Sequence, residues 1–265
     1  MTRSLFARRP WERLRDAAVS PGALLIGVDL DGTIAPIQDH PEKARVLPRV
    51  IELLRKGMHA PRTKVAIVSA RPVSAIRRLI PIPGLHRSGQ YGLAGTHAPH
   101  LERRTELRRV VALLARHATY EVAEIHGAWV EQKGLTVAVH DRAVAPAHLA
   151  ALRRIVRRRL LPEARRLGFR PMQGNRVVDF VPEGFDKGAA LARIRREYQP
   201  DVTLYVGDSP SDELAFRILG EGDFPVHVGR GPTRATFRVA CPADVARLLA
   251  AVVRWRTRAN GSARR

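Results

Sequence analysis

The feature that most constrains the fold is a series of short apolar segments that each end in acidic or polar residues and precede a helical pattern. Residues 23–29 form an apolar run that ends at Asp29, and residues 64–69 form another that ends at Ser69. Such runs are typical of buried parallel strands, whose carboxyl ends carry polar loops. We predict that helices follow over about residues 48–56, where Gly57 stops the helix, and over residues 72–80.

The same alternation returns in the last third of the chain. There we predict, in order, helix 187–198, strand 203–207, helix 212–219, strand 224–228 and helix 243–255. Alternating strands and helices favour an α/β fold, a Rossmann-like parallel sheet covered by helices on both faces. Residues 257–265 are polar and basic and contain a glycine, so we expect a frayed tail there.

In the middle of the chain the predicted helices alternate with pairs of strands instead of single strands. The sequence of this region predicts helix 105–120, strands 129–133 and 135–140, helix 146–167, and strands 169–173 and 177–181. The pairs Lys133-Gly134 and Gly174-Asn175 supply glycine or asparagine where a tight reversal between strands needs positive φ. We therefore expect an inserted α+β cap over residues 101–183, between core segments 1–100 and 184–265, above the strand ends where α/β sheets bind ligands.

Composition excludes several classes of protein. No segment of the 265 residues approaches the roughly 18–20 uninterrupted apolar residues of a membrane span, and residues 1–15 lack the apolar run of a secretion signal. We expect a cytoplasmic protein that has no membrane partner and is a monomer. The single cysteine, Cys241, excludes an intrachain disulfide and is expected to be buried.

The formal net charge of +21 raises the alternative of a nucleic-acid partner. Aromatic residues make up only 5% of the chain and are not interleaved with the basic residues, so base-stacking platforms are not evident. Many of the arginines lie along the predicted helix 146–167, where they form a solvated face. We therefore do not expect specific nucleic-acid binding, and a positive field also attracts phosphate esters.

The loop that follows the first strand carries two carboxylates and a hydroxyl, in the order Asp29-Leu-Asp31-Gly-Thr33. Side chains two apart in an extended segment share a face, so Asp29 and Asp31 can point to one reacting phosphate. A carboxylate can accept a phosphoryl group when a cation offsets the repulsion, and Mg²⁺ prefers such oxygen ligands. The second aspartate can act as general acid and base. The alternative is an acidic turn without catalytic function.

Three further segments place suitable side chains at strand ends or helix starts. Ser69 is a candidate phosphate ligand or a helix N-cap, and Arg71 lies near a helix N-terminus, which attracts anions. Lys187 begins a helix and can neutralise a phosphate, or it is one of many surface cations. In Gly207-Asp208-Ser-Pro-Ser-Asp212, Asp208 is a candidate Mg²⁺ ligand, and Asp212 is a second ligand or an N-cap.

Together these four segments resemble the haloacid dehalogenase superfamily of phosphotransferases, and the resemblance extends over nearly the whole chain in the expected order. It implies that Asp29 is the nucleophile and Asp31 the general acid and base. It also implies a metal site for the Mg²⁺ cofactor and a set of phosphate-binding side chains. The metal ligands would be Asp29, Asp31 through its carbonyl and Asp208, and the phosphate would be bound by Thr33, Ser69 and Lys187. Their positions at helix starts add Asp212 as a candidate metal ligand and Arg71 as a candidate phosphate-binding residue.

The predicted cap region contains segments that are more specific than the four segments of the core. The segments 90–95, 129–133, 140–142 and 178–182 resemble the trehalose-6-phosphate phosphatase family. That resemblance implies that Glu131 and Lys133 contact sugar hydroxyls, which suit charged hydrogen-bond partners, and that Asp179 is a third substrate contact. Their alternative is a salt-bridged strand pair. Asp179 stands where the family usually has glutamate, Ser209 where it has aspartate, and Ala70 where it has glycine.

We therefore expect a Mg²⁺-dependent phosphatase that converts trehalose 6-phosphate to trehalose and phosphate through an aspartyl-phosphate intermediate. A phosphatase for another glycosyl phosphate, such as glucosyl- or mannosyl-3-phosphoglycerate or sucrose 6-phosphate, is the nearest alternative, because related caps serve those substrates. A nucleic-acid-binding protein on a phosphatase-like scaffold is the alternative of a different class. The intact set of acidic segments argues against a purely binding role.

Overall fold

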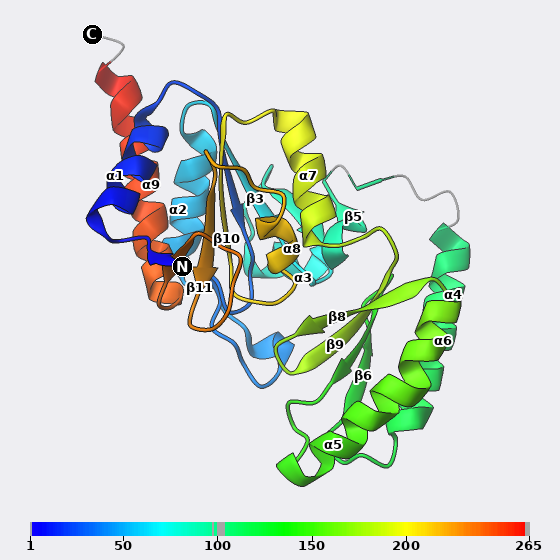
Figure 1. Ribbon diagram of the computed structural model, residues 1–265. Coiled ribbons are helices and arrows are strands. Elements are labelled where there is room, and N and C mark those ends of the chain that lie inside the picture. The colour runs from blue at the N-terminus through cyan, green and yellow to red at the C-terminus, as the bar shows by residue number, and fades with distance from the viewer. Residues whose placement is uncertain (1, 97, 100–103, 263–265) are drawn as a thin grey trace.

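The structure is a computed structural model, and it describes residues 2–96, 98–99 and 104–262 of the chain. Figure 1 shows two sheets, each with its own helices. The larger has eight strands in the order β1-β12-β11-β10-β2-β3-β4-β5, and the smaller has four in the order β6-β7-β9-β8. The chain thus has the mixed α/β architecture that its alternating pattern predicts.

The eight-stranded sheet forms the core, and all of its strand pairs are parallel except β4 with β5. Its centre is β2, which pairs in register with β10 and β3, so that Val28 stands beside Val206 and Ile67. The carboxyl ends of these strands therefore meet at one edge. The strands are β1 (Arg3–Ser4), β2 (Leu24–Val28), β3 (Thr63–Val68), β4 (His86–Gly89), β5 (Ala94–Gly95), β10 (Val202–Gly207), β11 (Phe224–Val228) and β12 (Phe237–Val239).

Helices cover both faces of this sheet because its strands are apolar on both sides. In β2, Ile26 packs in a cluster with residues of α1, α2, α3 and α9, whereas its neighbour Leu25 packs with residues of α7 and α8. In Figure 1, α1, α2 and α9 lie to the left of the sheet and α7 to its right. The helices are α1 (Arg8–Val19), α2 (Pro48–His59), α3 (Val73–Leu79), α7 (Lys187–Tyr198), α8 (Glu213–Phe216) and α9 (Pro242–Ser262).

The smaller sheet is antiparallel, and its helices lie on the side turned away from the core (Figure 1). Residues such as Val139 and Phe180 of one face pack with Leu114 and Leu152 of the helices. The other face of the smaller sheet is therefore turned toward the edge of the core sheet at which the core strands end. The elements are α4 (Arg104–Val122), β6 (Trp129–Gln132), β7 (Val137–His140), α5 (Pro146–Ile155), a π-helical turn (Val156–Leu160), α6 (Leu161–Arg166), β8 (Phe169–Gly174) and β9 (Val177–Pro182).

We propose that this unit is the cap. The boundary expected between residues 100 and 101 lies outside the described residues, and the boundary expected after residue 183 follows β9 directly. Tyr91 and Leu93 of the core form a buried cluster with Leu135, Met172 and Val181 of the smaller unit, so the two units share apolar contacts near that junction.

The expected positions of most elements are confirmed, and some expectations were wrong. Gly57 does not stop α2, which continues to His59; a Cβ there would lie 3.1 Å from Val65 Cγ2, so the glycine permits close packing of helix on strand. Helix 146–167 contains the π-helical turn just before Pro162, whose ring cannot fit a regular α-helical turn. The helix expected over residues 212–219 is the shorter α8, which ends at Phe216. Beyond it, the N–H groups of Ile218 and Leu219 donate to carbonyls three residues earlier, as in a tighter turn, before Gly220.

The turns and termini also differ from the sequence prediction. Gly134 has φ +76°, as expected, but in the second hairpin the left-handed residue is Arg176, with φ +59°. The expected frayed tail is wrong for residues 257–262, which continue α9, and residues 263–265 lie outside the described part. One residue before this segment, Arg256 ties α9 to the core, because its buried guanidinium donates hydrogen bonds to the carbonyls of Ala18, Gly22 and Pro61.

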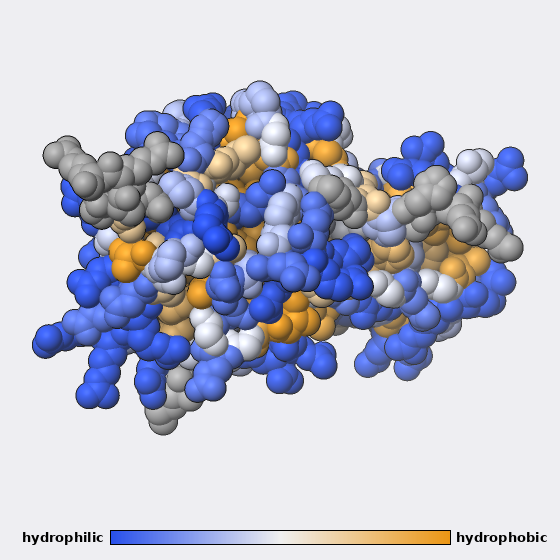
Figure 2. All heavy atoms as spheres, turned by 90° about the horizontal axis from the view of Figure 1, so that it is seen from above, coloured by the Kyte–Doolittle hydropathy of each residue, from blue (hydrophilic) through white to orange (hydrophobic). Residues whose placement is uncertain are grey.

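Polar side chains dominate the surface. Figure 2 shows a mostly hydrophilic face on which apolar residues appear in separate small groups. Within the described residues, no helix combines the length and apolar character needed to cross a bilayer. Cys241 is exposed, which contradicts the expectation that it is buried.

Candidate active site

The nucleophile candidate Asp29 lies one residue beyond the end of β2. Its backbone N–H continues the sheet by donating to the Val206 carbonyl at 2.9 Å, and its side chain is only 4% exposed. The following turn needs Gly32, because a Cβ there would approach Asp208 Oδ2 to 2.0 Å and its φ is +78°. The Asp-x-Asp-Gly-Thr order thus brings the first and last acidic segments into contact.

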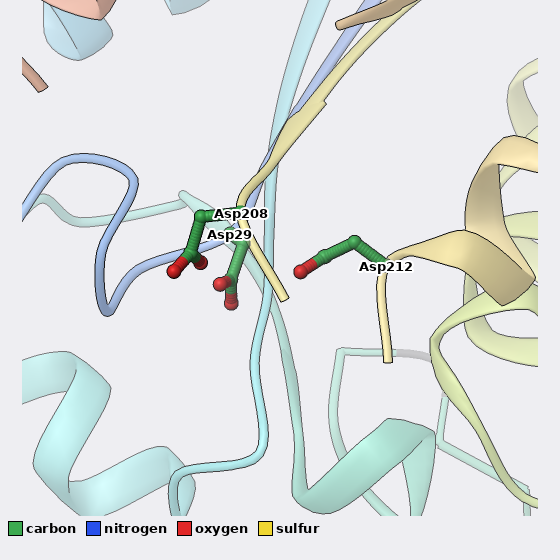
Figure 3. A group of neighbouring side chains, drawn as sticks. All are labelled: Asp29, Asp208 and Asp212. Carbon is green, nitrogen blue, oxygen red and sulfur yellow. The ribbon is translucent and has the colours of Figure 1, made fainter. Parts of the chain in front are cut away.

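Three carboxylates meet at this edge of the sheet. Oxygens of Asp29, Asp208 and Asp212 lie within 4.8 Å of one another, and Figure 3 shows Asp29 and Asp208 side by side with Asp212 pointing toward them. Burial, followed by the charge of Asp212, raises the pKa of Asp208 to about 7. Burial also raises the pKa of Asp29, although Lys187 opposes the shift. The cluster therefore holds negative charge that the protein compensates incompletely.

This donor set fits a divalent cation. Hard carboxylate oxygens are the ligands that Mg²⁺ prefers, and three of them converge in a buried place where an added positive charge relieves their repulsion. The carboxylate of Asp31 lies outside this group of three, so any contribution of Asp31 would come from its backbone carbonyl. Asp29, Asp208 and Asp212 are the side chains that would hold the ion.

Lys187 is the basic partner of the cluster. Its ammonium group lies 2.8 Å from Asp29 Oδ1 and 2.9 Å from Asp212 Oδ1, and the side chain is 2% exposed. Burial lowers the pKa of Lys187, but Asp212 and Asp29 raise it above the ordinary value, so the side chain stays charged. The alternative of a surface cation is therefore wrong.

Asp212 is positioned by several donors at once. Lys187, the Tyr205 hydroxyl at 2.8 Å and the Ser209 hydroxyl at 2.6 Å all donate to its carboxylate, and the Ser209 N–H donates at 3.0 Å. Its side chain is thus directed into the cluster. Ser209 thus orients Asp212 through both its hydroxyl and its backbone N–H. Sequence reasoning did not single out Tyr205, since a tyrosine in an apolar strand carries no signal of this role.

Asp31 and Arg71 form a bidentate pair at the mouth of the cluster. The Arg71 guanidinium donates to the two Asp31 oxygens at 2.7 and 2.8 Å. Burial lowers the pKa of Arg71, but the hydrogen bonds and charge of Asp31 raise it overall. In this arrangement the expected phosphate-binding arginine is bound to the expected general acid and base.

Two other expected phosphate ligands also have partners within the protein. The Ser69 hydroxyl, 1% exposed, accepts the Arg71 N–H at 3.2 Å and lines the cavity described below. The Thr33 hydroxyl donates to Asp208 Oδ1 at 3.3 Å and is fully buried. Thr33 therefore orients a carboxylate in this state of the protein.

The smaller unit contributes a second polar cluster, opposite the first. The Asp179 carboxylate accepts from Lys133 Nζ at 2.8 Å and from the Tyr91 hydroxyl at 2.8 Å, and all three side chains are at most 9% exposed. Burial, and then the charge of Asp179, raises the pKa of Tyr91. Asp179 is thus engaged by Lys133 rather than open to a ligand. Tyr91, from segment 90–95, was not among the expected site residues.

Glu131 has a different set of partners. Its carboxylate lies 3.0 Å from His140 Nε2 and 3.8 Å from Lys133 Nζ, and the His140 ring stacks on Trp129. Burial raises the pKa of Glu131, but the His140 hydrogen bond and the Lys133 charge lower it overall, so the side chain is ionised near neutral pH. Its side chain is 30% exposed, so it can reach a ligand.

One cavity of about 280 Å³ joins the two clusters. Its walls come from the core edge on one side and from the inward face of the smaller sheet on the other. The residues that line it include Asp29, Asp31, Ser69, Arg71, Lys187 and Asp208 of the core and Glu131, Lys133, His140 and Asp179 of the opposite sheet. The expected catalytic and sugar-binding residues thus meet in one cleft.

The known proteins that this chain resembles point to one family. A family model described as trehalose-phosphatase matches residues 27–243. The chain belongs to the trehalose-phosphatase family. Among its relatives is the trehalose-6-phosphate phosphatase of Escherichia coli K12, which is 28% identical over 229 residues and for which the alignment covers 82% of each chain.

A Mycobacterium tuberculosis protein described as an uncharacterized glycosyl hydrolase is 34% identical over 240 residues. That match covers 84% of this chain but only 18% of the relative, so this trehalose-phosphatase family chain spans less than a fifth of that protein. The solved C-terminal domain of the Candida albicans trehalose-6-phosphate phosphatase superposes with a TM-score of 0.81 at 19% identity, over 96% of this chain and 99% of that one. At this identity the likeness shows that the two chains share a fold.

Proposed function

We propose that the protein is a Mg²⁺-dependent phosphatase that hydrolyses trehalose 6-phosphate to trehalose and inorganic phosphate. The observation that carries the proposal is the shared cavity, in which Asp29 faces the same space as Glu131 and Lys133. A nucleophile for phosphorus and polar groups suited to sugar hydroxyls are then within reach of one substrate. Membership of the trehalose-phosphatase family supports the choice of sugar.

The first half-reaction uses Asp29 and Asp31. An Asp29 oxygen attacks phosphorus, the bond from phosphorus to the sugar oxygen breaks, and Asp31 transfers a proton to the departing oxygen. Asp31 has to carry that proton, and in the present arrangement Arg71 donates hydrogen bonds to both of its carboxyl oxygens. An incoming phosphate offers Arg71 a more highly charged partner. Transfer of Arg71 to the phosphate would free the Asp31 carboxyl group to face the departing oxygen.

The second half-reaction hydrolyses the aspartyl phosphate. Asp31, now a carboxylate, accepts a proton from water as the water oxygen attacks phosphorus, and the bond to Asp29 breaks to release phosphate. Lys187, held between Asp29 and Asp212, stabilises the charge that spreads over the transferring group. A Mg²⁺ ion held by Asp29, Asp208 and Asp212 would add positive charge beside the phosphate and orient it.

The proposal predicts a clear substrate order. Phosphate release is measured with trehalose 6-phosphate, sucrose 6-phosphate, glucosyl 3-phosphoglycerate and glucose 6-phosphate at equal concentration, with Mg²⁺ and with excess chelator. We expect kcat/KM for trehalose 6-phosphate to exceed the others by at least about 100-fold, since groups that bind a hydroxyl discriminate by several kcal/mol against analogues that lack it. Chelator should abolish turnover of all four. A preference for another glycosyl phosphate would contradict the proposed sugar, and turnover that survives chelation would contradict the proposed cofactor.

A Glu131→Gln variant tests the sugar contact. Loss of a charged hydrogen-bond partner costs about 1.5–3 kcal/mol, so we expect kcat/KM for trehalose 6-phosphate to fall roughly 10- to 100-fold. The fall should be much smaller for p-nitrophenyl phosphate, which has no sugar. Glu124→Gln, an exposed change on the same unit, is the matched control. Equal losses on both substrates would mean that Glu131 supports the fold rather than the sugar.

A further inference from the structure

A second cavity lies within the smaller unit, on the helix side of its sheet. Its volume is about 440 Å³, which is larger than the active-site cavity and within the size range of small-molecule sites. Strands β7 and β9 contribute its floor, and α5 and the start of the π-helical turn contribute its wall, on the side turned away from the core (Figure 1). No described residue lines both cavities, so the second cavity is separate from the candidate active site.

The two cavities lie back to back across one sheet. Successive side chains of a strand point to opposite faces, so Val139 lines the second cavity while His140 lines the active-site cavity. In β9, Val178 and Asp179 divide in the same way. A ligand in the second cavity would therefore contact, from behind, the strands that present His140 and Asp179 to the active-site cavity.

Three arginines give the second cavity a positive charge. Arg153 and Arg157 lie four residues apart on its wall, and within the described part of the chain neither forms an ion pair. Two residues further on, Arg159 does pair with Glu121, at 3.7 Å. The third arginine, Arg176, comes from the turn between β8 and β9. The predicted solvated face of helix 146–167 thus includes two arginines whose charges are open to a ligand in a cavity.

Arg176 is held in place without a ligand. Its Nε lies 2.8 Å from Asp141 Oδ1, and its Nη2 donates to the Asp141 carbonyl at 2.5 Å. Among the described residues its other terminal nitrogen, Nη1, has no acceptor, so it keeps its donors for a ligand. A guanidinium that is already fixed loses little freedom on binding, and its planar donors match the oxygens of carboxylate, sulfonate and phosphate groups.

The rest of the lining is largely apolar. The apolar side chains are Val139, Leu152, Val156 and Val178. Val139 and Leu152 are buried, whereas Val156 and Val178 are half-buried and leave apolar surface beside the arginines. An organic anion would cover this surface, which an inorganic ion would leave in contact with water. None of the described residues that line the cavity is aromatic, so it offers no stacking platform for a nucleic-acid base.

We propose that this cavity is a binding site for a small organic anion. The anionic group pairs with Arg153, Arg157 and Arg176, and the apolar body of the ligand covers Val156 and Val178. The proposal is independent of the proposed function, because none of these five residues lines the active-site cavity. A failure of the phosphatase assay would therefore leave it standing, and a failure of the binding experiment would leave the phosphatase standing.

Isothermal titration calorimetry with naphthalene-2-sulfonate tests the site, because this probe joins one anionic group to an apolar body. In about 0.15 M NaCl, which screens weak surface attraction, we expect the wild type to bind one molecule. The Arg153→Gln/Arg157→Gln double variant should raise Kd at least about tenfold through the loss of charged hydrogen bonds. Arg154→Gln/Arg158→Gln is the matched control, since it removes the same charge from exposed positions that do not line the cavity, and should change Kd less than about twofold.

The two halves of the probe are separated by 2-naphthol, which lacks the charge, and by inorganic sulfate, which lacks the apolar body. Each should bind at least about tenfold more weakly than naphthalene-2-sulfonate. Val156→Phe, which fills the cavity and removes no charge, should weaken binding of the sulfonate to a similar extent. Both double variants should keep the wild-type melting temperature, because all four arginines are exposed.

Three results would overturn the proposal. Equal weakening by the two double variants would show that the probe follows net charge and not the cavity. Unchanged affinity in Arg153→Gln/Arg157→Gln would place the probe elsewhere on the protein. Absence of binding to the wild type would show that the cavity does not accept an organic anion of this kind.

Discussion

An Asp29→Asn variant is expected to lose at least about 10⁴-fold in kcat on every phosphate ester that the wild type hydrolyses. The asparagine amide is not a nucleophile toward phosphorus, and the neighbouring carboxylates of Asp208 and Asp212 are held by Thr33, Lys187 and Ser209, so they cannot take its place. Phosphate release under single-turnover conditions, with the variant in excess, measures the loss directly.

The same variant should fold as well as the wild type. Burial and the charges of Asp212 and Asp208 raise the pKa of Asp29, which means that its ionised form is costly where it lies. A neutral asparagine of nearly the same shape removes that cost, and Lys187 keeps Asp212 as its partner. Urea unfolding should therefore show a free energy of unfolding equal to or above the wild-type value.

Asp31→Asn separates the two half-reactions. Because p-nitrophenolate departs without a proton, this variant should still transfer the phosphoryl group from p-nitrophenyl phosphate to Asp29 and then stall. Mass spectrometry of the quenched protein should show one added phosphoryl group in Asp31→Asn and none in Asp29→Asn. Substantial turnover by Asp29→Asn would remove the nucleophile from the proposed mechanism.

The arrangement of the core could be predicted from the sequence, because the residue pattern of each strand matches its position in the sheet. β2, β3 and β10 are short apolar runs, and such runs leave few choices other than central strands of a parallel sheet. β1 and α1 went unpredicted, since Arg3–Ser4 is too short for any period and α1 contains Pro10. The prediction of a frayed tail over residues 257–265 was wrong for its first part. In the sequence Arg256, just before it, resembles the many surface arginines, but its side chain is buried.

The candidate site, too, could be predicted from the sequence only in part. That Asp29, Asp208 and Lys187 would meet follows from the rule that parallel strands end at one edge. Which partner each side chain takes does not follow from that rule. Arg71 pairs with Asp31, and Thr33 pairs with Asp208, across 40 and 175 residues of sequence. Such choices depend on differences of an ångström or two between loops, which no pattern of residue types contains.

Lys187→Met is expected to be the most destabilising single change at the site. Methionine keeps the length of the buried stem, so the change isolates the loss of charge from the creation of a cavity. The ammonium group that contacts Asp29 and Asp212 disappears, and three carboxylates within 4.8 Å of one another are left without it. Breaking a buried ion pair by removing one partner costs about 3–5 kcal/mol, a large part of the stability of an ordinary domain.

Urea unfolding at fixed neutral pH with chelator present measures this loss, and Lys56→Ala supplies the comparison. Lys56 pairs with Glu52 one helical turn away at 2.6 Å, but its side chain is 60% exposed, so that variant should lose far less stability than Lys187→Met. If the two lysine variants were equally stable, Lys187 would not be compensating the cluster.

Mg²⁺ then distinguishes a charge defect from a packing defect. With the ammonium gone, the oxygens of Asp29, Asp208 and Asp212 attract a divalent ion more strongly, so saturating Mg²⁺ should raise the free energy of unfolding of Lys187→Met by more than it raises that of the wild type. Activity should not return with stability, because the cation that faces the transferring phosphate through Asp29 is still absent. A variant that regained both would show that the metal alone suffices to balance this cluster during phosphoryl transfer.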